Sequence, residues 1–245
     1  MKNILFLFTF ILCMFVMPGI STSEPVGAET SPETSSEDLT KTSPKIPPVA
    51  PSFDSHQEIL GKLETRYNAA DFFANFSQES TLQALDITDT AAGKVWFKHQ
   101  AMMRWEYERP EKYAIISDGK NLWIYRPEDN QVVIGDAMAY FGNGKGASFL
   151  SNFKLVQDAY TVSIAKPAND DQYTLKLVPM QKQMDLSAIF LNIEKKSFDI
   201  KSVLTLNDYG DETRIEFSDS IFEDLDASLF NFKIPPGADI LKLDE

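Results

Sequence analysis

Apolar residues recur at every second position through much of the chain after residue 70. The clearest runs are Met103, Trp105 and Tyr107; Tyr173, Leu175 and Leu177; and Ile189, Leu191 and Ile193. A period of two places one side of a strand against a core and the other side in water. Because turn signals such as Asp118-Gly119 separate the runs, the pattern predicts an antiparallel meander of half-buried strands.

The segment before these runs has a helical period instead. Ser55 and Glu58 form a capping box, in which each side chain accepts a hydrogen bond from the backbone N–H of the other residue. Apolar residues then follow on one helical face, namely Ile59, Leu60, Leu63 and Tyr67. The pattern predicts one amphipathic helix over residues 56–69.

A glycine-rich stretch, Gly142–Gly146, interrupts the strand pattern. Behind it Phe149, Leu150 and Phe153 lie at helical spacing, which predicts a second short helix. The pair Gly144-Lys145 resembles part of a phosphate-binding loop, but Gly stands after the Lys where such a loop requires Ser or Thr. We therefore interpret the stretch as a connection.

The number of strand-like segments sets the architecture. About ten or eleven of them follow the first helix, too many for a flat open sheet. We expect a mainly β (α+β) domain, a half-open antiparallel β-barrel of about 11 strands whose concave apolar face is covered by helices. A single curved sheet has no second sheet to pack on, so side chains, helices or an apolar ligand must fill its concave side. The pattern does not choose among these three.

The N-terminus carries an apolar stretch from Ile4 to Met17 behind Lys2. The stretch is shorter than the roughly 20 residues of a membrane-spanning helix, and small residues follow it, as is typical of a signal peptide. We expect residues 1–23 to be a signal peptide cleaved after Ser23, with Ala28 as the alternative site. The protein would then work outside the cytoplasm.

The rest of the N-terminal region predicts a tether and no lipid anchor. Cys13, the only cysteine, follows Leu12, whereas a lipid-attachment site needs a small residue before its Cys. Residues 24–52 are rich in Ser, Thr, Pro and Glu, a composition that predicts a disordered tether. Residues 53–245 are expected to form one domain.

Composition argues against nucleic-acid binding and against catalysis. The chain has 23 basic and 36 acidic residues and a net charge of −13; loss of Lys2 would leave 22 against 36, or −14. Without a basic cluster, nucleic acid is not an expected partner. The two histidines, His56 and His99, have no metal-ligand spacing. Glu106 and Glu108 could pair in glycoside hydrolysis, but strand alternation places both on a polar face. We expect no catalytic residue, no metal and no cofactor, and therefore no enzyme.

Five segments share their order and spacing with one known family. They are Phe72, Phe76 and Gln78; Gly93–Lys98; Met103–Tyr107 with Pro110; Ile116–Pro127; and Phe230–Asp239. The fourth segment is the most specific, because it follows the pattern (V/I)-S-D-G-x-x-(L/V)-W-x-Y-x-P. Over about residues 59–240 the chain resembles the periplasmic outer-membrane lipoprotein carrier family, LolA.

The resemblance implies an unclosed barrel whose apolar interior accepts the acyl chains of lipoproteins. The partners that it implies are lipoproteins, an inner-membrane ATP-driven extraction complex and an outer-membrane lipoprotein receptor. It further implies a monomer in the periplasm of a Gram-negative bacterium. By position, the acyl-chain cavity would be formed by Phe72, Phe76, Trp96, Met103, Trp105 and Ile115. The lids would contribute Leu60, Leu63, Phe149, Leu150 and Phe153.

One position departs from the family. LolA proteins commonly have an Arg there that hydrogen-bonds to the lid backbone, whereas this chain has His99. Imidazole donates fewer hydrogen bonds than guanidinium, so we expect a weaker and pH-sensitive lid latch. Arg104 lies on the opposite strand face and is not an obvious substitute. Two other functions stay open, namely a carrier of another amphiphile such as a glycolipid for an exporter, and a lipid-sensing periplasmic regulatory domain.

Overall fold

The structure is a computed structural model, which describes residues 55–99, 101–141, 148–151, 153–167 and 169–243. The predicted signal peptide and tether lie outside the described residues, and so does the glycine-rich loop. The described chain begins with helix α2 (His56–Ala69), which has the bounds that the sequence predicts. Its capping box is present, because Ser55 N donates to Glu58 Oε2 at 2.8 Å and Glu58 N donates to Ser55 Oγ at 3.2 Å.

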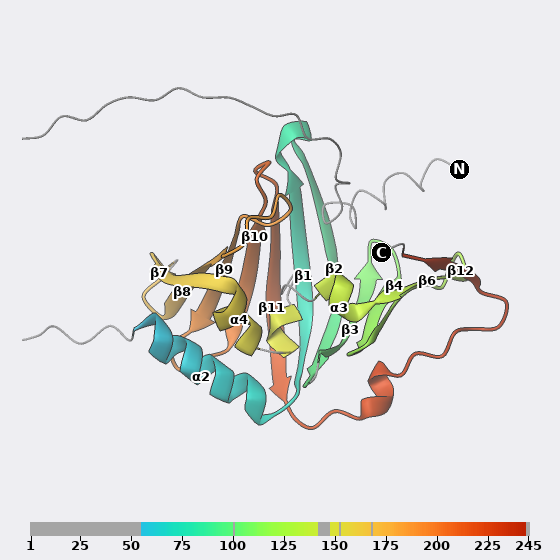
Figure 1. Ribbon diagram of the computed structural model, residues 1–245, viewed down its shortest axis with the longest axis horizontal. Helices are drawn as coiled ribbons and strands as arrows, with labels where there is room; N and C mark the ends of the chain where they lie inside the picture. The colour runs from blue at the N-terminus through green and yellow to red at the C-terminus, as the bar shows by residue number, and fades with distance from the viewer. Residues whose placement is uncertain (1–54, 100, 142–147, 152, 168, 244–245) are drawn as a thin grey trace, which may run out of the picture. The chain divides into compact units, whose positions relative to one another are not determined.

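Within the described residues, the rest of the fold is one sheet with short helical connections (Figure 1). The first six strands are β1 (Phe72–Leu82), β2 (Ile87–Lys98), β3 (Met102–Arg109), β4 (Tyr113–Asp118), β5 (Asn121–Arg126) and β6 (Gln131–Asp136). The others are β7 (Tyr160–Ala165), β8 (Gln172–Pro179), β9 (Ala188–Glu194), β10 (Ile200–Leu206), β11 (Glu212–Phe222) and β12 (Asp239–Lys242). The connections include η1 (Gln83–Leu85), α3 (Ala137–Phe141), η2 (Ser148–Ser151), α4 (Lys154–Ala159) and η3 (Ala227–Phe230).

The sheet is open. Its strand order is β12-β6-β5-β4-β3-β2-β1-β11-β10-β9-β8-β7, so β12 and β7 form two free edges. The predicted half-open, mainly β architecture is confirmed, with twelve strands in place of about eleven. The additional strand is β12, which pairs in parallel with β6. All four of its residues are exposed, so no alternation of buried and exposed positions marks it as a strand.

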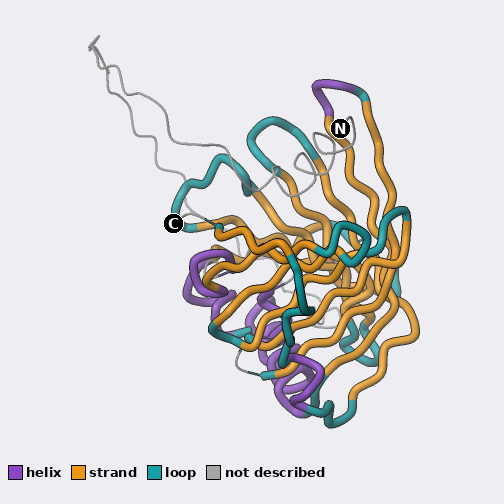
Figure 2. The backbone as a smooth tube through the Cα atoms, turned by 90° about the vertical axis from the view of Figure 1, so that its right-hand side faces the viewer, coloured by secondary structure: helices purple, strands orange, loops and turns teal. Residues whose placement is uncertain are grey.

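The two faces of the sheet differ in what covers them. We call the face that packs against α2, η2 and α4 the inner face, and the opposite one the outer face. Figure 2 shows most of the helical segments on one side of the curved strands, with η1 apart from them at the tip of the β1–β2 hairpin. Apolar side chains from both halves of the sheet form one buried cluster on the inner face, including Phe72, Phe76, Phe97, Met103, Trp105, Leu175, Leu177, Ile189, Leu191, Ile193 and Phe217.

The chain after β11 covers part of the outer face, which the sequence pattern did not predict. Phe230 in η3 is 1% exposed, and η3 packs against β3 and β4. Arg104 Nη1 donates to the carbonyl oxygen of Leu229 at 3.0 Å. The ring of Phe232 lies 6.0 Å from Trp123 and 5.3 Å from Tyr125, between ring centroids. We call this segment, from η3 to Phe232, the C-terminal strap. It keeps outer-face apolar residues of β3 to β5 away from water.

Asp71 joins three parts of the chain just before β1. Its Oδ2 accepts hydrogen bonds from Lys98 Nζ at the end of β2 and from Leu225 N, the latter at 2.9 Å, and its carbonyl oxygen accepts from Glu223 N at 3.0 Å. Burial opposes ionisation of Asp71, but the hydrogen bonds from Lys98 and Leu225 outweigh it and hold the pKa of this carboxyl below its usual range.

Replacing Asp71 by Asn is expected to lower the free energy of unfolding by about 2 kcal/mol at pH 7, because Lys98 loses its partly buried counter-charge. The folded-state pKa is lowered, so this stabilisation exists above the unfolded pKa of about 4 and disappears as the pH falls through the folded-state value. Urea titrations at pH 7 and pH 3 measure both effects. Asp158→Asn, at an exposed position of α4, is the control; equal stability of Asp71→Asn and wild type at pH 7 would contradict the assignment.

Candidate functional site

The structure brings the five expected lid residues together. Leu60 and Leu63 reach the inner face from α2, and Phe149, Leu150 and Phe153 reach it from η2 and the start of α4. Each is buried in the same apolar cluster, with exposed fractions between 0% and 6%. In this closed arrangement, the lid side chains fill the concave side of the sheet.

Five of the six expected cavity residues lie under these lids. Phe72, Phe76, Met103 and Trp105 are buried on the inner face, and Ile115 is partly buried against them. The Trp105 ring lies 4.9 Å from Phe76 and 5.7 Å from Phe97, edge to face in both pairs. Together these side chains form a continuous apolar floor across β1 to β4.

Trp96 is not part of this floor, so its expected place in the cavity is wrong. It pairs with Phe73 across β1 and β2, and the two rings lie 5.3 Å apart on the outer face. Val95 and Phe97 take the inner positions, at 0% and 2% exposure. The register of β1 and β2 decides the side on which Trp96 lies. Phe72 pairs with Phe97, and paired residues share a face, so Phe97 lies on the inner face and its neighbour Trp96 on the outer one.

Half of the apolar floor was missing from the expected site. Strands β8 to β10 contribute Leu175, Leu177, Ile189, Leu191, Ile193, Ile200 and Val203, each at most 1% exposed. Their alternation was visible in the sequence as strand pattern. Only the pairing of β1 with β11 brings them beside the first half of the sheet, and this long-range contact has no local signature.

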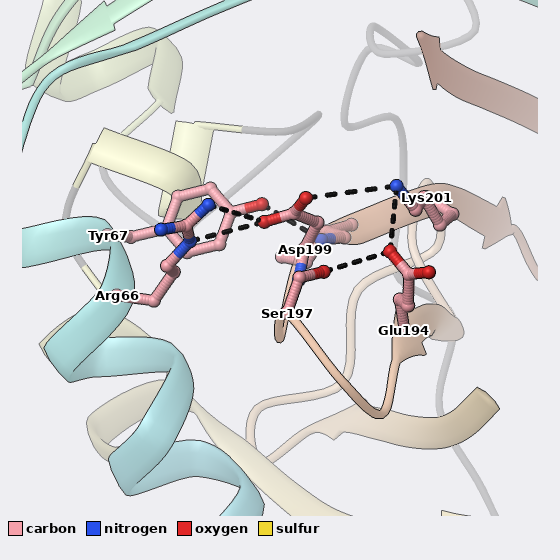
Figure 3. Close-up of polar contacts among 7 residues, drawn as sticks. Arg66, Tyr67, Glu194, Ser197, Asp199 and Lys201 are labelled. Atoms are coloured by element: carbon pink, nitrogen blue, oxygen red, sulfur yellow. Dashed lines mark hydrogen bonds and ion pairs between the residues drawn. The ribbon is translucent and has the colours of Figure 1, made fainter. Parts of the chain in front are cut away.

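Polar contacts hold the C-terminal end of α2 to the turn between β9 and β10 (Figure 3). Arg66 Nη2 and Nε donate to Asp199 Oδ1 at 2.9 and 3.2 Å, and the guanidinium lies 3.8 Å from the ring centroid of Phe222. The buried backbone N–H of Ile200 donates to Tyr67 Oη at 2.9 Å. Burial is the main cause that raises the pKa of Tyr67, so its hydroxyl stays neutral.

A second set of charges supports the turn. Lys201 Nζ lies 3.1 Å from Glu194 Oε2 and 3.8 Å from Asp199 Oδ2, and Ser197 Oγ donates to Glu194 Oε2 at 2.9 Å. These contacts keep Asp199 in position for Arg66 (Figure 3). We call the contacts of Arg66 and Tyr67 with this turn the anchor of α2, because they hold the C-terminal end of the helix to the sheet. The side chains of Ile59, Leu60 and Leu63, nearer the N-terminal end, make only apolar contacts with the cluster.

The expected latch residue His99 follows β2 directly and is partly exposed. Within the described residues it makes no hydrogen bond, and its role as a latch stays a prediction. Arg104 lies on the outer face, as expected, where it donates to Glu106 Oε1 at 2.6 Å as well as to Leu229. It therefore secures the C-terminal strap and does not face the lids.

A pocket of about 560 Å³ lies at β1, β2 and β11, and Gln78 is among its lining residues. Its polar lining includes Ser77, Thr90, Arg109, Arg214 and Glu216. In the described part of the chain, no group of three or more His, Cys, Asp or Glu residues is placed to hold a metal ion. No described helix is long and apolar enough to cross a membrane.

Comparison with known proteins identifies the family of this fold. The family model described as outer membrane lipoprotein carrier protein LolA matches residues 68–233. The chain belongs to the LolA family. The match runs from the last turn of α2, through every strand from β1 to β11, to the C-terminal strap.

Relatives of this LolA-family chain are distant but span most of it. An outer-membrane lipoprotein carrier protein of Nitrosospira multiformis is 26% identical over 190 residues, which are 76% of this chain and 90% of the relative. One of Neisseria meningitidis is also 26% identical, over 162 residues, 66% of this chain and 76% of the relative. An uncharacterized conserved protein of Thermus thermophilus has a similar fold, with a TM-score of 0.51 and 16% identity over 76% of this chain and 98% of its own.

Replacing Tyr67 by Phe is expected to lower the free energy of unfolding by about 1–2 kcal/mol, because the buried N–H of Ile200 loses its acceptor. The same change should raise amide hydrogen exchange in α2 more than in the strands, since α2 loses an anchor. Hydrogen exchange followed by mass spectrometry measures the difference. Tyr209→Phe, in an exposed turn, is the matched control; unchanged exchange in α2 would show that the hydroxyl does not hold the helix.

Proposed function

We propose that this LolA-family protein binds the acyl chains of lipoproteins between its lids and the inner face of its sheet, and carries them across the periplasm. The observation that carries the proposal is the apolar floor closed by separate helices and not by a second sheet. The name that its relatives carry, outer-membrane lipoprotein carrier protein, supports the choice of cargo.

The energetics of an acyl chain explain why a carrier is needed. Each methylene that leaves water is stabilised by about 0.8 kcal/mol, so even ten methylenes contribute roughly 8 kcal/mol against free diffusion of the lipid through water. An acyl chain can replace the lid side chains Leu60, Leu63, Phe149 and Phe153 on the floor without exposing the floor to water. The exchange replaces one apolar contact by another, so it requires only a small change in free energy.

The anchored end of α2 gives this exchange a direction. Arg66 and Tyr67 hold the helix to the turn before β10, so the part that can leave the floor is the N-terminal half with Ile59 and Leu60. Met103 suits a floor that must fit chains of varied shape, since its side chain is flexible and polarisable. The protein acts as a monomeric chaperone without catalysis in this proposal.

The route follows from the same interpretation. An inner-membrane ATP-driven extraction complex supplies the lipoprotein, and an outer-membrane receptor accepts it. A signal peptide over residues 1–23 would place the protein in the periplasm of a Gram-negative bacterium, between these partners. Transfer at each end requires a partner that binds the open or the closed lid more tightly, because only such a partner shifts the population between them.

Cargo identification tests the proposal. Mass spectrometry of the protein purified from a periplasm is expected to detect triacylated peptides. Met103→Glu should lower their amount at least ten-fold, because a charge on the apolar floor is costly to desolvate. Met102→Glu is the matched control, since strand alternation points Met102 to the outer face. Equal loss in both variants would mean that the floor is not the binding surface, and glycolipid alone would indicate a carrier of another amphiphile.

The latch proposal for His99 has its own test. His99→Arg is expected to slow release of a bound acyl probe several-fold, because guanidinium can donate more hydrogen bonds to a closed lid than imidazole can. Stopped-flow measurement of release at pH 6 and pH 8 separates the charge of His99 from its shape. His56→Arg, in the first turn of α2, is the control. An unchanged release rate at both pH values would remove His99 from the mechanism.

A further inference from the structure

The inner face is not apolar along its whole length. Along β1 the inward residues Phe72, Ala74 and Phe76 are followed by Gln78, and along β3 Met103 and Trp105 are followed by Tyr107. Tyr113 begins β4 and Arg126 ends β5 at the same end of the sheet. We call Gln78, Tyr107, Tyr113 and Arg126 the polar row.

The register places these four side chains beside one another. Tyr107 pairs with Tyr113 across β3 and β4, and their rings stack with centroids 4.2 Å apart at 10°. Ala114 pairs with Tyr125, so the next residue, Arg126, lies beside Tyr113 on the inner face. The charge of Arg126 acts on the hydroxyl of Tyr113, which supports this placement.

The polar row adjoins the apolar floor directly. Tyr107 Oη donates to Gln78 Oε1 at 2.9 Å, and Gln78 Nε2 donates to Ser80 Oγ at 3.1 Å. The Tyr107 ring also lies 5.0 Å from the Phe76 ring, edge to face. A molecule on the floor near Phe76 would therefore meet hydroxyl and guanidinium groups at this end.

The row offers hydrogen-bond donors in a neutral form. Burial is the first cause that raises the pKa of both Tyr107 and Tyr113 far above the usual value, and it raises the pKa of Tyr140 in α3 to about 12. These hydroxyls stay protonated at any physiological pH. Among the described residues, no carboxylate forms an ion pair with Arg126.

The guanidinium of Arg126 is the charged group of the polar row. Its Nε is buried and has no hydrogen-bond partner. A buried donor on a charged group normally has a partner, because leaving it without one is destabilising.

We propose that the polar row binds the carbonyl oxygens at the polar end of an acylated cargo, with the Arg126 guanidinium as the donor. The proposal rests on the proposed function and adds an orientation to it. The acyl chains would lie over Phe76 and Trp105 and run toward Phe72. The seven residues from Phe72 to Gln78 span roughly 20 Å of strand, comparable with a long extended acyl chain.

A matched pair of lipids tests this assignment. Dioctanoylglycerol has two ester carbonyls, and dioctylglycerol has ether oxygens in their place but the same chain length. Each is titrated against the purified protein loaded with a fluorescent apolar probe, and displacement gives the affinity. Wild type is expected to bind the diester about ten-fold more tightly than the diether, which corresponds to one or two hydrogen bonds from a charged donor.

Arg126→Met should remove this preference and leave diether binding unchanged. Its melting temperature should not fall below that of wild type, because the change removes an unpartnered buried donor. Arg109→Met, at the exposed end of β3, is the matched control and should retain the preference. Tyr113→Phe is a second variant, which keeps the stacked ring and Arg126 and should therefore retain the preference.

Each other outcome has a distinct meaning. Equal binding of diester and diether by wild type would overturn the polar row as a carbonyl site and leave the carrier proposal intact. Failure of both lipids to displace the probe would count against the carrier proposal itself. Dioctanoyl phosphatidic acid binding far more tightly than the diester, in a manner that depends on Arg126, would show a phosphate site and overturn the carbonyl assignment.

Discussion

The structure depends on one constraint, which is that a single open sheet has an apolar inner face and no second sheet to cover it. A β-sandwich solves this problem with a partner sheet, and a closed barrel solves it by filling its interior. Here α2 and the segment from η2 to α4 cover the face instead. Neither α2 nor α4 takes part in the strand pairing, so the proposed opening of this cover would break no strand ladder. The proposed binding of acyl chains uses this property.

The helices that cover the inner face also need an attachment to the sheet. Two polar junctions provide it, and both involve chain segments far apart in sequence. Arg66 and Tyr67 hold α2 to the turn at Asp199 and Ile200, and Asp71 holds the start of β1 to Lys98 and Leu225. Both junctions lie at the end of α2 that leads into β1. In the proposed function, opening of the lid would therefore involve the rest of the helix and not this end.

Local signals in the sequence predicted most elements and about half of the site. The capping box at Ser55 gave the start of α2 correctly, because a cap depends on residues three apart. Alternation gave the inner faces of β3, β8 and β9 correctly for the same local reason. Trp96 was misplaced because a motif identifies a strand without stating which parity faces the core, and its partner Phe73 settles that only once β1 and β2 are paired. The C-terminal strap and β12 depend on tertiary contacts of exposed residues, which carry no periodic pattern.

A carrier must bind its cargo firmly and also release it. Apolar contact alone makes controlled release difficult, because it is spread over a large surface and does not fix the position of the cargo. Acyl chains can slide along a smooth apolar floor in many positions of similar free energy, because dispersion and burial have little directionality. Hydrogen bonds at one end of the floor restrict the chains to one register and one direction without adding to the buried apolar area. The polar row lies at that end of the floor. The polar contacts that anchor α2 involve other residues. Arg126 Nε is buried at that end of the floor without a hydrogen-bond partner among the described residues, and in the proposed complex a carbonyl oxygen of the cargo would supply one. A partner that disturbs this one polar contact could then release the cargo without having to compete for the whole apolar surface.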